Sequence, residues 1–181
     1  MQGPAKLSKW LQHDDALGIE TLCLYVQGIK VKAQQGQRYR LMTYAAEDTH
    51  PLVAALVKRL NALPDRKLDI HVAKAGNFTA EVQRLARTLW PEHGHPITAT
   101  CFRHQWSADV KSTGDADAAS RGLGHRSDKT RKYYGTAHQA RDRHAVRPVR
   151  IEADLPLRAL PARARPITQT HINSKHAAEM G

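Results

Sequence analysis

The stretch "ASRGLGHRSDKTRKYYG", residues 119–135, carries side chains of the types that bind and attack a phosphate. His125 follows a tight glycine turn, a run dense in Lys and Arg comes next, and Tyr134 stands nine residues after His125. Arg103 precedes His125 by 22 residues, with a turn expected at Gly114 between them. Because this spacing lets the chain run out and return through two short helices, we expect Arg103 and His125 to converge on one face.

The three side-chain types together suit phosphoryl transfer. An arginine offers a planar fork for two phosphate oxygens, a histidine donates a hydrogen bond or moves a proton, and a tyrosyl oxygen can attack phosphorus covalently. Each residue also has a plainer interpretation. Tyr134 could be a packed ring beside a surface Tyr133, His125 could cap a turn, and Arg103 could be a surface charge.

The charge balance points to a polyanionic partner. The chain has 181 residues, enough for one domain, with 28 Lys and Arg against 17 Asp and Glu, a formal net charge of +11. Such an excess favours nucleic acid over other partners. No apolar run approaches the ~20 residues of a membrane span, and the N-terminus has no signal-peptide centre. With only Cys23 and Cys101, no disulfide framework is expected, which fits a reducing cytoplasm. Together with a nucleic-acid partner, this predicts a cytoplasmic location on the nucleoid.

Periodicity predicts most of the elements that would position these residues. Alternation and turn composition predict a β-hairpin within residues 20–44, and residues 68–73 read as a short strand. Helical spacing predicts helices over residues 50–63, 76–90 and 98–114. Thr79 is the expected N-cap of the second of these helices.

The remaining segments give weaker patterns. A helix is expected around residues 7–11, a short helix capped by Asp115 or Asp117 ends at residues 122–124, and a final helix covers residues 129–134. Residues 144–181 are rich in Pro and Arg without a sustained period, and predict a flexible basic tail. The fold class expected for residues 1–143 is α+β, predominantly α-helical with a small antiparallel sheet.

Neither a metal nor a cofactor is expected. The pair His93 and His95, and the pair His138 and His144, lack nearby cysteines and a His-Glu-x-x-His pattern. Gly-rich phosphate loops are also absent from the sequence. We therefore expect no small-molecule substrate and no membrane partner.

Three stretches resemble the tyrosine recombinase (phage integrase) family: "FRHQWSADVKSTG", "RGLGHRSDKTRKYYG" and "VQGIKVKAQQGQRYRL". In that family an Arg-His pair opens a helix, a Leu-Gly-His turn follows about twenty residues later, and the nucleophilic Tyr lies nine residues after that His. This spacing selects Tyr134 over Tyr133. The resemblance covers roughly residues 20–140 and implies an integrase-type catalytic core.

The resemblance also implies a role for each site residue. Tyr134 would attack a phosphate of double-stranded DNA, forming a 3′-phosphotyrosyl link and freeing a 5′-hydroxyl. Arg103 and His125 would bind that phosphate. Lys30 of the hairpin, with Lys32 as the second choice, would protonate the leaving oxygen. Such proteins act as homo-oligomers on DNA in recombination or integration, without ATP or a metal.

The sequence departs from the family pattern at two points. Thr100 stands where the family has a His, and the family's first arginine, upstream of the hairpin, has no counterpart because Arg38 is the first arginine in the chain. The resemblance is therefore to a catalytic domain incomplete at its N-terminal side. The alternative function is a catalytically impaired, integrase-like protein that binds DNA as a remnant or regulator. A third hypothesis, an RNA-binding structural protein, is supported by the net charge alone.

Overall fold

The chain folds around a five-stranded antiparallel sheet with strand order β4-β1-β2-β3-β5. We describe a computed structural model, in which residues 5–28, 36–48, 50–72, 74–127, 133–140 and 145–158 are placed. The strands are β1 (Ala5–Asp14), β2 (Ile19–Gln27), β3 (Tyr39–Ala45), β4 (Lys67–Val72) and β5 (Arg150–Ala153). The helices are α1 (Pro51–Asn61), α2 (Ala75–Leu89), α3 (Ala99–Lys111), α4 (Ala116–Leu123) and the 3₁₀ helix η3 (Ala137–Gln139).

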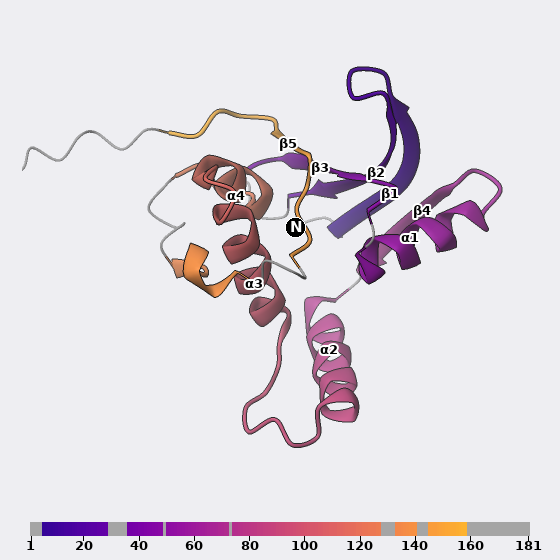
Figure 1. Cartoon of the computed structure of the whole chain (residues 1–181). Helices are drawn as coiled ribbons and strands as arrows, with labels where there is room; N and C mark the ends of the chain where they lie inside the picture. Colours follow the sequence, from indigo (N-terminus) through magenta and orange to yellow (C-terminus); the bar gives the residue numbers. More distant parts are fainter. Residues whose placement is uncertain are drawn as a thin grey trace, which may run out of the picture.

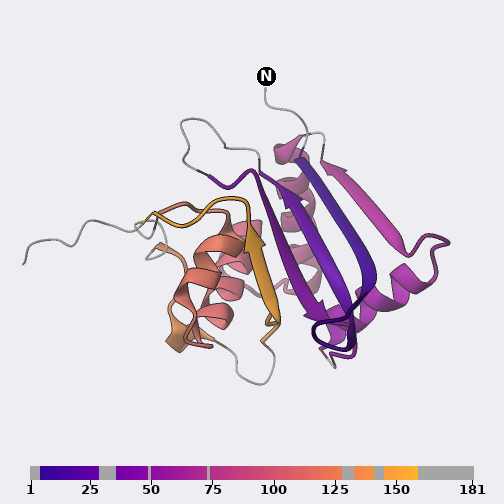
Figure 2. The ribbon, with the colours of Figure 1, turned by 90° about the horizontal axis from the view of Figure 1, so that it is seen from above.

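Two hydrophobic clusters join the helices to the sheet. At one end, α1 packs on β1, β2 and β3 through the buried residues Leu11, Leu22, Tyr44, Val53 and Leu60. At the other end, Val110 of α3 and Ala118 and Ala119 of α4 pack with Ile151 of β5. Seen from above, β5 lies at one edge of the sheet beside the α3–α4 pair, and β4 lies at the other edge (Figure 2).

The register of β2 and β3 decides which side chains face the helices. Leu22 lies opposite Tyr44, and Leu24 lies opposite Met42. Because side chains alternate along a strand, Arg40 shares the face of Met42 and Tyr44. An arginine therefore extends the apolar row of β3 toward α3 and α4.

The expectation of a predominantly helical fold is wrong. The described part of the chain is only 37% helical, and its centre is the five-stranded sheet. The helix expected at residues 7–11 is strand β1, which pairs with both β2 and β4. Leu7 and Leu11 are spaced as on one helix turn, but they also lie on one face of a strand, and pairing on both sides decides the outcome.

The segment assigned to a basic tail contributes an edge strand. β5 lies within residues 144–181 and pairs with β3 from Arg40 opposite Ala153 to Thr43 opposite Arg150. Residues 145–158 therefore belong to the folded domain, and residues 159–181 lie outside the described residues. The Arg150 guanidinium reaches the buried Asp14 at the end of β1, with 2.5 Å between Nη2 and Oδ2. This ion pair helps to hold β5 in the sheet.

The other expected elements are present with adjusted bounds. The hairpin of β2 and β3, the strand β4 and the helices α1, α2, α3 and α4 correspond to predicted segments. Thr79 lies inside α2, whose N-cap is Lys74. The helix expected at residues 129–134 falls mostly outside the described residues. Among the helices that the structure describes, none combines the length and apolar character needed to cross a membrane.

Helix α2 stands apart from the two clusters (Figure 1). Its apolar row contains one buried residue, Ala86, whereas Leu85 and Leu89 are exposed. The amphipathic pattern therefore predicted the helix correctly but not a buried face.

Matched truncations in α1 and α2 test this division. We expect Leu60→Ala, at a residue 1% exposed, to lower the free energy of unfolding by about 2–5 kcal/mol, because it leaves a cavity in the core. Leu89→Ala, at a residue 63% exposed, should change it by less than about 0.5 kcal/mol. Urea unfolding followed by circular dichroism measures both. Equal losses would contradict the core assignment.

Candidate active site

The turn after α4 fixes the position of His125. The Asp115 carboxylate caps α4 by accepting from the Ala118 backbone N–H at 2.7 Å. At the other end, Gly124 adopts φ +78°, a left-handed conformation that glycine reaches without strain. The backbone N–H of His125 then donates back to the Ser120 carbonyl at 2.9 Å. The Leu-Gly-His turn is thus a helix C-cap that points His125 toward α3.

Arg103 joins α3 to this turn. Its Nη2 donates to the Leu123 carbonyl at 2.6 Å and lies 3.2 Å from Nε2 of His125. Its Cζ lies 5.0 Å from the centre of the Tyr134 ring, within the range of a cation–π contact. The structure therefore brings together the three residues selected from the sequence, Arg103, His125 and Tyr134.

Tyr134 is held by its backbone as well as by its ring. The His125 and His104 rings each lie 5.1 Å from its ring centre. Lys111 of α3 donates to the Tyr134 carbonyl and to the Gly135 carbonyl, the latter at 2.6 Å. Because these contacts come from α3 and the α4 turn, the phenol is fixed relative to Arg103.

Gly135 allows this close approach. A Cβ at this residue would lie 2.3 Å from the His104 carbonyl oxygen and 3.0 Å from the Ala108 Cβ. Its backbone N–H donates to Nδ1 of His104 at 3.2 Å. The neighbouring Tyr133 is 66% exposed, so the two adjacent tyrosines occupy different environments.

A residue that the sequence reasoning missed, Arg40, completes the cluster of cations. Its guanidinium lies against the turn, since a Cβ on Gly124 would lie 2.6 Å from its Nη1. Burial, together with the charge of Arg103, lowers the pKa of Arg40 to about 10. The signal that could have found it is the alternation in "RYRLMTY", which places Arg40 on the apolar face of its strand.

Burial and the surrounding cations keep His125 neutral. Burial and the charges of Arg103, Arg40 and Lys111 lower the pKa of His125 to about 4. Since an arginine only donates, its contact with Nε2 makes that nitrogen the acceptor and leaves the proton of the neutral ring on Nδ1. Nδ1 is buried and has no hydrogen-bond partner among the described residues. At neutral pH His125 therefore carries a buried N–H donor that no described residue pairs with.

Gln37 ties the hairpin to the same turn. This residue, 1% exposed, accepts from the Leu155 backbone N–H at 3.0 Å and donates to the Leu155 carbonyl at 2.8 Å and the His125 carbonyl at 3.3 Å. The backbone N–H of Gln37 donates to the Gly124 carbonyl at 3.0 Å. The predicted general acid Lys30, and Lys32, lie outside the described residues. The contacts of Gln37 fix the end of the β2–β3 connection, which follows these lysines in the sequence, beside His125.

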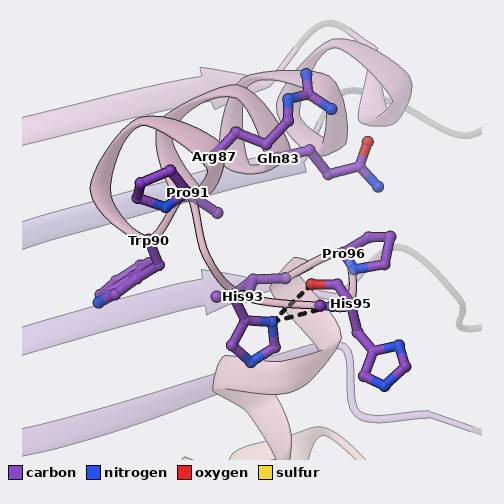
Figure 3. Close-up of a pocket in the computed structure, with 10 residues that line it drawn as sticks. Gln83, Arg87, Trp90, Pro91, His93, His95 and Pro96 are labelled. Carbon is purple, nitrogen blue, oxygen red and sulfur yellow. Dashed lines mark hydrogen bonds between the residues drawn. The ribbon is translucent and has the colours of Figure 1, made fainter.

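Two hollows are present near these elements. One, of about 490 Å³, is lined mostly by apolar side chains of β2, β3, α1, α3 and α4 and by Val146. Its polar lining consists of Arg40, Arg103, Gln105 and Asp109. The other, of about 270 Å³, lies between α2 and the loop that follows it, where Trp90 and Pro91 stand near His93 and His95 (Figure 3). The second hollow contains none of the residues of the Arg-His-Tyr cluster.

His93 and His95 do not form part of a larger ligand set. The His95 backbone N–H donates to Nδ1 of His93 at 3.3 Å. Within the described ranges, no three His, Cys, Asp or Glu side chains are grouped as a metal site requires.

The chain was compared with known proteins by three routes. No family model, no curated protein and no solved structure matched it. The resemblance to tyrosine recombinases therefore stays a prediction, carried by the residues and by the geometry around Tyr134.

The lowered pKa of His125 predicts a pH-dependent stability. The unfolded chain binds a proton at this residue near pH 6.5, whereas the folded chain binds it only near pH 4. Between these values protonation favours the unfolded state, so stability should fall as the pH is lowered. We expect urea unfolding to show a steeper loss from pH 6.5 to 4 in the wild type than in His125→Gln. The exposed His138→Gln is the control and should follow the wild type.

The Gln37 contacts predict a specific loss of stability. Gln37→Leu leaves the two Leu155 backbone groups without their partner, which should cost about 1–3 kcal/mol. Gln27→Leu, on an exposed residue, makes the same chemical change and should cost less than about 0.5 kcal/mol. Chemical denaturation compares the two, and an equal effect would show that Gln37 is not a structural link.

Proposed function

We propose that this chain breaks and rejoins DNA strands in site-specific recombination or integration, with Tyr134 as the nucleophile. The observation that carries the proposal is the contact of the Tyr134 ring with both Arg103, at 5.0 Å, and His125, at 5.1 Å. A tyrosine held against a guanidinium and a neutral histidine N–H donor is suited to meet a phosphodiester.

The reaction exchanges one phosphate ester for another. The Tyr134 oxygen forms a bond to phosphorus as the bond from phosphorus to the 5′-oxygen breaks, and the phenolic proton passes to solvent water. The departing oxygen takes up a proton and becomes a 5′-hydroxyl. Because the ester energy is kept in the 3′-phosphotyrosyl link, rejoining is the reverse step and needs no nucleotide triphosphate.

Each neighbour has a separate part in this step. The Arg103 guanidinium binds the non-bridging oxygens, and the Nδ1 proton of His125 donates to the same phosphate. Lys30 is proposed as the group that protonates the leaving oxygen. The hairpin in which it lies is tied to His125 through Gly36, which pairs with His125, and through Gln37.

Double-stranded DNA is the proposed partner. The net charge of +11 attracts a polyanion without selecting a sequence, so binding should weaken steeply with salt. Assembly of several copies on DNA, in the cytoplasm at the nucleoid, belongs to the same proposal.

A second candidate function is DNA binding without cleavage. It is favoured by Thr100, which stands where the family pattern has a His. In this case Arg103 and His125 would hold the backbone phosphate, and Tyr134 would pack beside them without attacking it.

A nicked suicide duplex separates the two candidates. DNA selected by the protein from a random-sequence duplex library is rebuilt with a nick beside each candidate phosphate, so that a cleaved fragment diffuses away and traps the adduct. We expect a denaturant-resistant protein–DNA adduct with the wild type and with Tyr133→Phe, reduced by at least about 1,000-fold in Tyr134→Phe because the attacking oxygen is removed.

The paired tyrosines make the result specific. An adduct that persists in Tyr134→Phe would contradict the assignment of the nucleophile. Tight, salt-sensitive binding with no adduct from any variant would contradict strand breakage and leave the DNA-binding function.

A further inference from the structure

We propose that Arg40 is a second phosphate-binding group, so that one backbone phosphate is held between a strand arginine and a helix arginine. The proposal deepens the function proposed above and rests on it for the identity of the ligand as DNA. The ability to bind phosphate is a separate property and can be measured without cleavage.

The sheet delivers Arg40 to the site from a direction different from that of Arg103. In β3, Arg40 pairs with Val26 of β2 on one side and with Ala153 of β5 on the other. Both arginines line the same cavity of about 490 Å³. An anion between them would be contacted by the sheet on one side and by α3 on the other.

Buried hydrogen-bond donors of this cluster lack partners. The Nε atoms of Arg40 and Arg103 and the Nδ1 atom of His125 are buried without a hydrogen bond to any described residue. The ion pairs of the described residues include neither Arg40 nor Arg103, although Asp109 lines the same cavity. Buried donors without partners cost stability, and the three N–H groups are those that phosphate oxygens would accept from.

Gly124 makes room for the Arg40 guanidinium. The left-handed turn ends α4, and a Cβ there would lie 2.6 Å from Nη1 and 3.3 Å from Cζ of Arg40. The residue that directs His125 therefore also admits the second arginine. The Leu-Gly-His turn thus serves both groups.

The electrostatics distinguish a ligand site from a structural arginine. Burial is the main cause of the lowered pKa of Arg40, and the charge of Arg103 adds to it. Burial also comes first for the lowered pKa of His125, followed by the charges of Arg103 and Arg40. A structural arginine is normally paired with an acid, whereas these like charges repel one another. The negative charge of a bound phosphate would offset this repulsion.

Inorganic phosphate is the first probe, with the His125 ring signals in an NMR titration as the readout. We expect phosphate to raise the pKa of His125 in the wild type. Arg40→Met should weaken phosphate binding by at least about tenfold, the loss of one charge-assisted contact. Arg38→Met removes the same charge two residues away, from a side chain that is 74% exposed, and should weaken binding by less than about threefold.

The melting temperature of Arg40→Met distinguishes a ligand-binding role of Arg40 from a structural one, because loss of a structural arginine would lower it. Because Arg40→Met removes an unpaired charge and its repulsion with Arg103, we expect the melting temperature without phosphate to stay equal or rise. Arg40→Lys keeps the charge without the fork. It should also weaken phosphate binding, more than Arg38→Lys does.

The outcomes decide the proposal independently of DNA cleavage. Equal phosphate affinities in Arg40→Met and Arg38→Met, or a lowered melting temperature with unchanged phosphate binding, would overturn it. If Arg40→Met loses phosphate binding and the wild type forms no adduct, the phosphate site stands. Only the proposal of strand breakage is then rejected.

Discussion

The cluster around Tyr134 depends on one electrostatic constraint, the confinement of Arg103 and Arg40 beside a neutral histidine. Neither arginine is neutralised by an acidic side chain among the described residues, and buried N–H donors of both are unpaired. The arrangement costs stability in the free protein. An anion that accepts from both guanidiniums and from His125 would relieve that cost, and a phosphodiester has the charge and the oxygens to do so.

The fold holds this unfavourable arrangement in place with separate links. The capped helix α4 directs His125, Lys111 holds the backbone of Tyr134, and Gln37 fastens the hairpin and the segment after β5 to the same turn. The core formed by α3, α4 and β5 lies beside this cluster. Since the links come from different elements, the geometry of the cluster depends on the β3–β5 side of the sheet as well as on α3 and α4.

Local signals were sufficient for the helices and the turn. The Asp115 cap, the Gly124 turn and the spacing from His125 to Tyr134 are all short-range features, and they predicted the Arg103–His125–Tyr134 cluster. Strand β5 and the burial of Arg40 depend on pairing between residues more than 100 positions apart, which periodicity does not detect. Strand β1 was missed for a different reason, because its leucines also fit a helix although it pairs with β2 in a local hairpin. The pattern of α2 predicted a buried apolar face, but Leu85 and Leu89 are exposed.

The central claim is that the Tyr134 oxygen attacks DNA at this cluster. The most direct measurement is to digest the trapped protein–DNA adduct with nuclease and protease and identify the modified peptide by mass spectrometry. The account predicts a nucleotide joined through its 3′-phosphate to Tyr134, in the peptide that begins after Lys132. A nucleotide on Tyr133 or on any other residue, or one joined through its 5′-phosphate, would contradict it.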